Sequence, residues 1–442
     1  MERTKMFHSK KRVFTGAALA AGTALILAGC ASGGSAPDAA ATFDPNEKVT
    51  LDFAFWGNDV RGDLYNQAIE AFNEEYPNIT VNSTFLAWDE YWEKRQTEAA
   101  GKNLPDVFQM DMTYVRQYSE NGLLADLSPY LGSIIATDGY EENVLNIAKV
   151  GDAVAGMPVS TNALGMFENP TLADEVGIAP FGGGSWDDYI DWLYDARDAA
   201  DAGGLEVWGG SNPTGFIQTF ELALRSEGKA VFNEDGEIGF TKEDLADFWN
   251  QGTPLIEDGV VIPQQRIEEL APLTGFDSAK QLSEITWDNF GAGYLANLGE
   301  AYPELDLVAP PVFKEGAKDL YLKAGMLLSA AQTSDHPQAA ATFIDFMVNS
   351  PEAGAIFGTN RGLPASSTQR DGVELDATAQ QILDYEASIA DRLGDPPPVP
   401  IIGYGSVEAK FKELGQELGF GTITVDDAVD QLFTEIDVIL NQ

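Results

Sequence analysis

The sequence predicts an α/β fold with a mostly parallel sheet flanked by helices, in a chain long enough for two domains. Alternating apolar and polar residues at Val49–Phe55 have the period of a strand, and Leu64–Tyr76 then carries apolar residues at helical spacing. A second strand is expected at Ile79–Phe85, a helix at Asp89–Ala100, and a short buried strand at Val107–Met110. This alternation is typical of βαβ units. Apolar residues make up 44% of the 442, so a sizeable core can form.

The ends of the predicted strands are the first candidates for a binding site. In open α/β sheets, ligands bind beyond the carboxyl ends of the strands. Two such ends are Trp56–Asp59 and Asp111–Tyr114.

The rest of the chain carries further helix and strand signals. A strand-like segment is expected at Val154–Phe167, and a short strand meets a loop at Ile285–Asn289. Pro337 is expected to begin a helix, while Pro396–Pro400 cannot be helical and is expected to form a stiff crossover. Ser/Thr-x-x-Asp capping boxes predict three more helix starts, at Ser185, Thr241 and Thr424.

The N-terminal residues have the architecture of a secretory signal. Five basic residues precede an apolar stretch, Val13–Leu27, that is short for a membrane span. The stretch ends in Leu27-Ala28-Gly29-Cys30, which resembles the lipobox of bacterial lipoproteins and contains the only cysteine of the chain. That resemblance implies cleavage before Cys30 and lipid attachment to it. An ordinary signal peptide with an incidental cysteine is the alternative. The following residues, up to Lys48, are expected to form a flexible tether.

Charge and cysteine content narrow the classes of partner. The formal net charge is −44, and it becomes −48 without residues 1–29, because these hold five basic residues and one acidic residue. Such a surface repels nucleic acid and anionic lipid headgroups, so we expect no nucleic-acid partner and a highly soluble body. With Cys30 lipidated, no cysteine is left for a disulfide bond.

Residue types for metal binding or covalent catalysis are scarce. Of the two histidines, His8 leaves with the signal, and His336 is interpreted as a helix-start residue before Pro337. Gly182–Ser185 precedes a predicted helix but lacks the lysine of a phosphate-binding loop, so a plain connection is expected. We therefore expect no catalytic residue, no metal ion and no cofactor. Paired carboxylates could still hydrolyse glycosides, and a secreted glycan-active enzyme remains the alternative.

Aromatic residues beside polar ones at predicted loop ends indicate a sugar site. The C–H faces of a sugar ring pack on Trp or Tyr, while its hydroxyl groups need donors and acceptors such as Asp, Asn and Arg. The combinations are Trp56 with Asn58 and Asp59, Trp208 near Asn212, Trp287 with Asp288 and Asn289, and Tyr404 after the proline run. For the tryptophans on helical stripes we expect core packing instead: Trp92, Trp186, Trp192 and Trp249.

Several segments in a fixed order resemble one protein family. They are Tyr91–Trp92, Leu104–Phe108, Asn121–Leu127, Gly156–Val159, Ala324–Met326, the Pro337–Met347 helix and Asn360–Pro364. In their order and spacing, from about Val49 to the C-terminus, the chain is similar to the extracellular solute-binding proteins of carbohydrate ABC importers, the group that includes the maltose-binding proteins. One departure is Phe167-Glu168-Asn169, where the family usually has Tyr-Asn-x.

The resemblance implies two α/β lobes joined by crossover segments, with the solute bound in the cleft between them. The expected parts are a signal peptide at 1–29, a tether at 30–48, an N-terminal lobe at 49–160 and 323–393, and a C-terminal lobe at 161–322 and 394–442. The resemblance places a set of residues near the cleft: Trp56 to Asp59, Asp111, Asn162, Trp287, Asn289 and Tyr404. It also matches Arg361 to a family segment where either a binding or a structural role is expected.

Together these observations predict a lipid-anchored, monomeric receptor at the extracellular face of the cell membrane. It is expected to bind a sugar or oligosaccharide, close over it, and deliver it to the transmembrane subunits of an ABC permease.

Overall fold

The computed structural model describes residues 48–271 and 273–441, all within one unit of the chain. The predicted signal peptide, the lipidation site Cys30 and the tether up to residue 47 lie outside the described residues. Among the helices of the described ranges, none combines the length and the apolar character that crossing a membrane requires.

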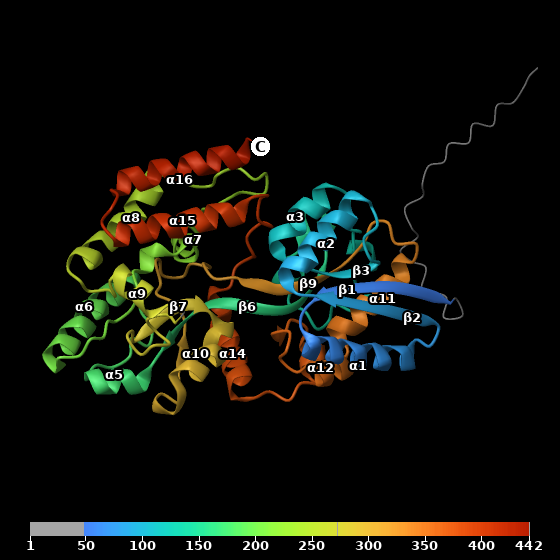
Figure 1. Cartoon of the computed structure of the whole chain (residues 1–442), viewed down its shortest axis with the longest axis horizontal. Helices are drawn as coiled ribbons and strands as arrows, with labels where there is room; N and C mark the ends of the chain where they lie inside the picture. Colours follow the sequence, from blue (N-terminus) through green and yellow to red (C-terminus); the bar gives the residue numbers. More distant parts are fainter. Residues whose placement is uncertain (1–47, 272, 442) are drawn as a thin grey trace, which may run out of the picture. The chain divides into compact units, whose positions relative to one another are not determined.

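A βαβαβ unit opens the first lobe, as predicted (Figure 1). Its elements are β1 (Val49–Trp56), α1 (Asp59–Glu75), β2 (Ile79–Leu86), α2 (Trp88–Ala100) and β3 (Val107–Met110). Strand β1 pairs in parallel with β2 along its whole length and with β3 at Phe53 and Ala54. In β1 every second side chain from Leu51 is buried, namely Leu51, Phe53 and Phe55, which confirms the predicted period of a strand.

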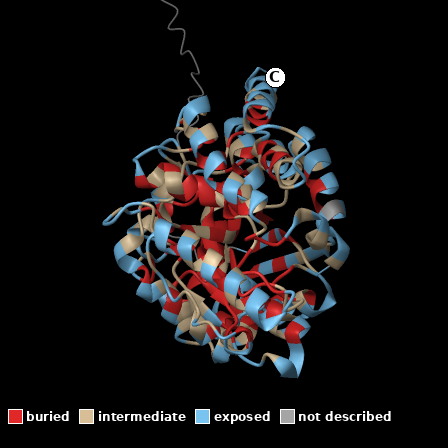
Figure 2. Cartoon of the chain, turned by 90° about the vertical axis from the view of Figure 1, so that its left-hand side faces the viewer, coloured by how far each residue is buried: buried red, intermediate tan, exposed pale blue. Residues whose placement is uncertain are grey.

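The remaining elements of the first lobe come from two distant parts of the chain. They are α3 (Met112–Glu120), η1 (Ser128–Tyr130), α4 (Glu142–Leu145), β4 (Lys149–Val150), β5 (Ala153–Val154), β9 (Leu322–Ala330), α11 (Pro337–Asn349), α12 (Pro351–Phe357), β10 (Leu363–Pro364) and α13 (Ser367–Arg370). Phe343 of α11 packs edge-on against Phe53 and Phe72 at 5.1 Å, which fixes this late helix to β1 and α1. Figure 2 shows such buried residues gathered along the strands and the inner faces of helices.

Strand β6 (Met157–Glu168) belongs to both lobes. All of its residues are buried. Its first part, Met157–Ala163, pairs with β9 of the first lobe, and its last part, Leu164–Glu168, pairs with β7 (Ser283–Trp287) of the second. Figure 1 shows β6 and β9 running side by side between the two halves. The change of partner between Ala163 and Leu164 therefore marks the crossing point of the two lobes, called here the β6 crossing.

The sheet is mixed in direction. Its order is β10-β6-β9-β3-β1-β2, with β7 and β8 (Asp306–Val308) pairing with β6 off this path. The predicted parallel pairing is found among β2, β1 and β3, which are joined by helical crossovers. β9 pairs antiparallel with both β3 and β6, and β10, β7 and β8 pair antiparallel with β6. These strands come from distant parts of the chain, so no short βαβ connection dictates their direction.

Helices dominate the second lobe. They are α5 (Pro170–Val176), α6 (Trp186–Gly203), η2 (Pro213–Gly215), α7 (Ile217–Ser226), α8 (Lys242–Glu257), α9 (Gln264–Leu270), η3 (Asp288–Phe290), α10 (Gly291–Leu298), η4 (Gly299–Ala301), α15 (Tyr404–Gly419) and α16 (Val425–Leu440). Helix α14 (Ala377–Ser388) and η5 (Ala390–Arg392) lie between β10 and the proline-rich segment. Phe220, Trp249, Phe411 and Leu432 share one core, so α7, α8, α15 and α16 pack as a group.

Local signals in this lobe are confirmed. Ser185 and Thr241 form complete capping boxes, and the Thr424 side chain accepts a hydrogen bond from the backbone of Asp427. The segment Pro396–Pro400 has no helix or strand. Core packing is likewise confirmed for three of the helical tryptophans, Trp92, Trp186 and Trp249, which are buried.

Glu168 explains the departure Phe167-Glu168-Asn169. Its buried carboxylate accepts hydrogen bonds from the backbone of Phe181 at 2.6 Å and of Gly182 at 3.0 Å. Gly182 has a positive φ, as do the two glycines after it, so the chain can turn its N–H groups toward that carboxylate. Burial raises the pKa of Glu168 to about 7. The glycine-rich segment is thus a connection, as predicted. The backbone N–H of Gly182 in this segment also donates hydrogen bonds to the buried carboxylate of Glu168.

Candidate functional site

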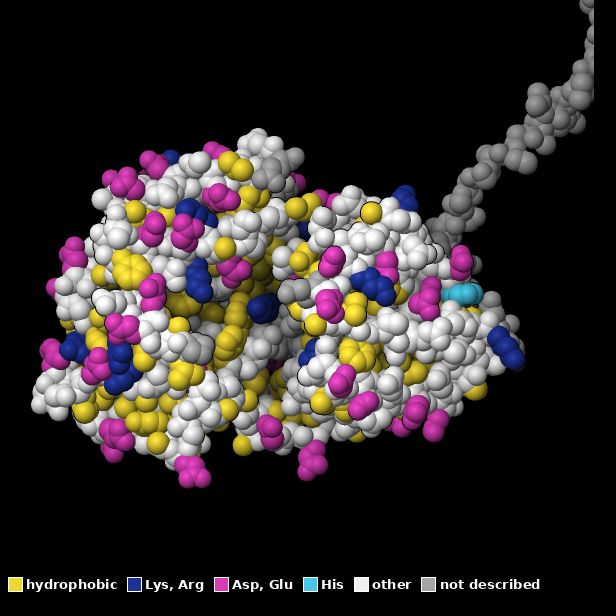
Figure 3. Space-filling model, viewed as in Figure 1, with side chains coloured by type: hydrophobic (Ala, Val, Ile, Leu, Met, Phe, Trp, Pro, Cys, Tyr) yellow, Lys and Arg dark blue, Asp and Glu magenta, His cyan; other side chains and the backbone are white. Residues whose placement is uncertain are grey.

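A cavity of about 540 Å³ lies at the β6 crossing, with residues of both lobes in its wall. The first lobe contributes Arg61, Asp111–Thr113, Ile147 and Asn360–Gly362; the crossing strands contribute Ser160, Asn162 and Tyr321–Met326; the second lobe contributes Gln218, Glu221, Val231, Phe232, Trp287, Asn289, Tyr404 and Glu408; and Pro396–Pro400 close one side. Figure 3 shows a hollow on this face, lined largely by hydrophobic side chains. Because the wall comes from both lobes, the affinity of this site for a ligand depends on how the lobes are arranged.

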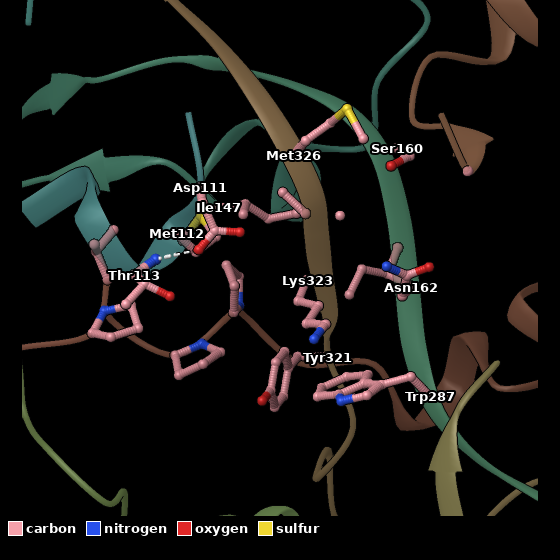
Figure 4. Close-up of a pocket in the computed structure, with 18 of the residues that line it drawn as sticks. Asp111, Met112, Thr113, Ile147, Ser160, Asn162, Trp287, Tyr321, Lys323 and Met326 are labelled. Carbon is pink, nitrogen blue, oxygen red and sulfur yellow. Dashed lines mark hydrogen bonds between the residues drawn. The ribbon is translucent and has the colours of Figure 1, made fainter. Parts of the chain in front are cut away.

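One wall of the cavity combines an aromatic ring with a lysine. Trp287 ends β7 half-buried, and the Lys323 ammonium lies 3.7 Å from its ring centroid, a cation–π contact (Figure 4). Within the described residues, this ammonium has no hydrogen-bond or ion-pair partner. Burial lowers the pKa of Lys323, while the carboxylates of Glu408 and Asp111 act in the opposite direction. The Lys323 ammonium is therefore stabilised by the Trp287 ring and by electrostatic attraction to nearby carboxylates. Its N–H groups are available to donate hydrogen bonds to a ligand.

The acidic groups of the cavity are partly engaged. The hydroxyl of Tyr321 donates to Glu221 at 2.7 Å, and the amide of Gln218 donates to Glu408 at 2.6 Å. Burial raises the pKa of Glu221. Asp111 caps α3 by accepting from the backbone of Thr113 at 2.9 Å with one carboxylate oxygen, as Figure 4 shows. Each carboxylate keeps an oxygen that accepts no hydrogen bond from the described residues.

The proline wall is fastened to the first lobe by one arginine. Arg116 of α3 donates to the carbonyl oxygen of Val399 at 2.7 and 3.0 Å and to that of Pro400 at 3.2 Å. Proline lacks an N–H group, so this segment cannot join a strand ladder and its carbonyl oxygens stay available for such contacts. The segment leads directly into α15, which carries Tyr404 and Glu408.

Six of the eleven residues predicted for the site line this cavity: Asp111, Asn162, Trp287, Asn289, Arg361 and Tyr404. The side-chain amide of Asn162 has no partner among the described residues, whereas Arg361 is buried and donates to the carbonyl oxygen of Met347 at 2.9 Å. The Arg361 guanidinium also lies 3.5 Å from the ring centroid of Phe357. Arg361 therefore makes structural contacts, although its Nε and Nη1 atoms have no hydrogen-bond partner among the residues that the structure describes.

The other five predicted residues do not line the cavity. Trp56 is half-buried against the rings of Trp88, Tyr91 and Trp92, at 4.9, 5.5 and 6.0 Å. Asn58 caps α1, and Asp59 is exposed in its first turn.

Trp208 and Asn212 also serve local structure. Trp208 is buried, and the Arg197 guanidinium lies 5.2 Å from the centroid of its ring. Asn212 caps η2 by accepting from the backbone and hydroxyl groups of Thr214.

Sequence reasoning missed several cavity residues. Lys323 had a usable signal, because it is the only charged residue in the mostly apolar β9 strand. Glu221 and Arg61 had none: each lies on an ordinary amphipathic helix, and only the packing of that helix points the side chain into the cavity. Arg61 donates to the backbone and side chain of Asn360, almost three hundred residues away in the chain.

Comparison with known sequences finds a family match. A model of the family described as bacterial extracellular solute-binding protein matches residues 56–354. Proteins of Brucella abortus (strain 2308) and Brucella suis biovar 1 (strain 1330), each named a binding protein, are 23% identical over 212 residues. This covers 46% of the chain, which spans about half the length (48%) of these curated relatives.

Comparison with solved structures finds the same fold. An extracellular solute-binding protein of family 1 from Alicyclobacillus acidocaldarius superposes with a TM-score of 0.73 at 25% identity, covering 90% of this chain and 100% of that one. A periplasmic oligogalacturonide-binding protein from Yersinia enterocolitica gives 0.76 at 19%, covering 89% and 99%. An ABC substrate-binding protein from Listeria monocytogenes in complex with cycloalternan gives 0.66 at 20%, covering 89% and 100%. The two-lobe α/β fold class expected from the sequence is confirmed.

Proposed function

This chain belongs to the bacterial extracellular solute-binding proteins, and from that premise we propose that it is the receptor of an ABC transporter for a sugar or oligosaccharide. The receptor captures its ligand in the cavity at the β6 crossing and delivers it to the membrane permease. Structural relatives that bind oligogalacturonide or cycloalternan support this assignment of ligand class.

The observation that carries the proposal is the make-up of the cavity wall. Trp287 and Tyr404 supply aromatic surface, and Asn162, Lys323 and Asp111 supply donors and acceptors that have no full set of partners in the protein. A sugar ring needs both, since its C–H faces pack on aromatic rings while its hydroxyl groups require hydrogen bonds. Buried polar groups left without partners are costly, so a polyhydroxylated ligand stabilises the closed cleft.

We propose that the protein binds its ligand without chemical turnover. In the part of the chain that the structure describes, the only histidine is His336 at the start of α11, and it does not line the cavity. The carboxylates of Glu221 and Glu408 are tied to Tyr321 and Gln218. Prolonged incubation with the tightest-binding sugar, followed by mass spectrometry, should recover that sugar intact; cleavage would favour the glycan-active enzyme.

The proposed location is the extracellular face of the cell membrane, with lipid on Cys30 and the folded part at the end of the tether. We propose the lobe boundaries given above, 49–160 with 323–393 and 161–322 with 394–442, and a monomeric receptor that meets the transmembrane subunits of its permease. The lipobox-like tetrapeptide before Cys30 and the family membership support this arrangement.

A thermal-shift screen over mono- and oligosaccharides tests the proposed function. A ligand that binds only the native state stabilises it by about 2.7 kcal/mol at a concentration one hundred times its Kd. At least one sugar should raise the melting temperature in a concentration-dependent manner, and calorimetric titration should then give one site per chain. A broad screen without any shift, on protein that melts cooperatively, would count against a sugar receptor.

A further inference from the structure

Two arginines hold the proline wall of the cavity, one from each lobe. Arg225 of α7 donates to the carbonyl oxygen of Asp395, immediately before the wall, at 2.7 Å. Arg116 of α3 donates to the carbonyl oxygen of Val399 at 2.7 and 3.0 Å and to that of Pro400 at 3.2 Å. The wall between these contacts lines the cavity along its whole length. Its two ends are thus attached to different lobes.

The end at Arg225 is held by several contacts within the second lobe. The same guanidinium donates to the carbonyl oxygen of Asp319 at 2.8 Å and lies 4.9 Å from the ring centroid of Tyr321. The backbone just before the wall is also paired, because Gly394 donates to the carbonyl oxygen of Leu320 at 2.8 Å. Loss of any one of these contacts leaves the others in place, so this end stays attached.

The end at Arg116 has fewer contacts and lies where the chain passes between the lobes. In the described part of the chain, no hydrogen bond other than those from Arg116 reaches the backbone of residues 396–400. The buried side chain of Val399 belongs to the core that also holds Val107 of β3. Two residues later, the buried side chain of Ile401 belongs to the core of α7, α8, α15 and α16. The arginine therefore acts at the last point before the chain enters the second-lobe core.

The composition of the wall makes it stiff. Four of its five residues are prolines, which have a fixed φ and no N–H group. Proline-rich segments adopt an extended conformation and act as semi-rigid spacers. Such a segment absorbs little of a change in lobe arrangement by bending, so the movement must occur at its ends. Opening of the lobes therefore separates Arg116 from the carbonyl oxygens that it holds.

Arg116 is placed to control the geometry of the cavity without touching a ligand. Its side chain is 13% exposed and does not line the cavity, whereas Asp111–Thr113 at the start of the same helix do. The wall leads directly into α15, whose first residue, Tyr404, lines the cavity from the second lobe. Figure 1 shows that α15 begins on the side that faces α3. The hydrogen bonds of Arg116 thus fix how close these two parts of the cavity wall stand.

We propose that Arg116 is a positioning residue of the ligand cavity and the latch of its proline wall. Its hydrogen bonds to Val399 and Pro400 hold the wall, and with it the start of α15, on the first lobe, and they break when the lobes open. The end at Arg225 stays attached throughout. The proposal rests on the proposed function in one respect, namely that this cavity is the ligand site. It predicts that the balance between open and closed arrangements depends on a side chain outside the cavity.

The distance between two spin labels, measured by pulsed electron paramagnetic resonance, tests the latch without any ligand. Gln96 of α2 and Gln431 of α16 are exposed residues of different lobes. Each is replaced by cysteine in the full chain carrying Cys30→Ser, so that the labels attach only at these two positions. Arg116→Ala should raise the ratio of long to short distances about tenfold or more, the factor that corresponds to losing a hydrogen bond from a charged group.

Three further variants separate the latch from a general loss of stability. Arg197→Ala is the matched control, because Arg197 also donates to a backbone carbonyl oxygen, that of Val207 at 3.1 Å, and pairs with an acid one turn later, but entirely within the second lobe. It should leave the distances unchanged. Glu120→Gln removes the ion pair of Arg116 at 3.2 Å and keeps the carbonyl contacts, so its shift should be smaller than that of Arg116→Ala. Arg116→Lys keeps the charge but lacks the forked donors, and it should shift the distances in the same direction should Arg116→Ala fail to fold.

A distance distribution in Arg116→Ala that equals that of the wild type overturns the latch, and so does an equal shift in Arg197→Ala. These measurements use no sugar, so they stand or fall separately from the sugar screen. The tightest-binding sugar of that screen, added to the same labelled proteins, then tests the positioning role. It should bring both forms to the short distance, at a concentration about tenfold or more higher for Arg116→Ala. Equal concentrations for both forms overturn the positioning role.

Discussion

Replacement of Trp287 by alanine is expected to weaken ligand binding far more than it weakens the fold. The ring is half-buried at the end of β7 and lines the cavity, and its centroid lies 6.2 Å from that of the Tyr321 ring. A buried aromatic residue at the centre of a binding site contributes about 2–4 kcal/mol. The affinity should therefore fall roughly 30- to 1,000-fold at one factor of ten per 1.4 kcal/mol.

The structure modifies this estimate in one way. The Lys323 ammonium lies 3.7 Å from the Trp287 ring centroid, so a sugar that stacks on that ring face must displace the lysine. A cation–π contact of this kind is worth about 0.5–2 kcal/mol, which is lost on ligand binding. The measured loss in Trp287→Ala should then lie toward the lower end of the range, and Lys323→Met should bind a neutral sugar no more than tenfold weaker than the wild type.

Calorimetric titration beside a melting curve without ligand measures both quantities. Trp88→Ala is a matched control, because Trp88 is an exposed tryptophan of the first lobe that does not line the cavity, and its affinity should be unchanged. Trp56→Ala should lower the melting temperature instead, since Trp56 packs against three aromatic rings. Unchanged affinity in Trp287→Ala, or an equal loss in Trp88→Ala, would refute this assignment of the ligand site.

Three further predictions concern stability and location. Burial raises the pKa of Glu284 to about 8 and that of Glu386 to about 7, so the folded state binds more protons than the unfolded state between about pH 4.5 and 8. The free energy of unfolding should therefore be highest near pH 5 and fall as the pH rises through about 7 to 8. Calorimetric melts at several pH values measure this change. The Arg392 guanidinium donates hydrogen bonds to the fully buried carboxylate of Asp319 at 2.8 and 3.0 Å. Arg392→Ala leaves this carboxylate without its cation and should destabilise the fold by about 3–5 kcal/mol in urea titrations. Asp319→Asn with Arg392 retained should cost less. In a bacterial host, Cys30→Ser should move the protein from the membrane fraction to the soluble fraction, and identical fractionation of both forms would contradict lipidation at that residue.

The local sequence determined the order and the ends of most elements. Strand β1, the caps at Ser185 and Thr241 and the irregular Pro396–Pro400 segment follow from interactions between residues a few positions apart. Pleat, capping and the missing proline N–H act over that short range, and for this reason they can be predicted from a single sequence. The same logic predicted a site at the end of β7, where Trp287 and Asn289 line the cavity.

The tertiary structure decided which strand ends face the ligand cavity. Trp56 and Trp208 have the same sequence context as Trp287, yet α2 covers the first and α6 presents Arg197 to the second. Lys323 and Glu221 reach the cavity only because β9 and α7 pack around the β6 crossing. An aromatic residue beside polar ones predicts that a side chain can bind a sugar; whether its face is open depends on residues tens or hundreds of positions away, which periodicity and capping do not encode.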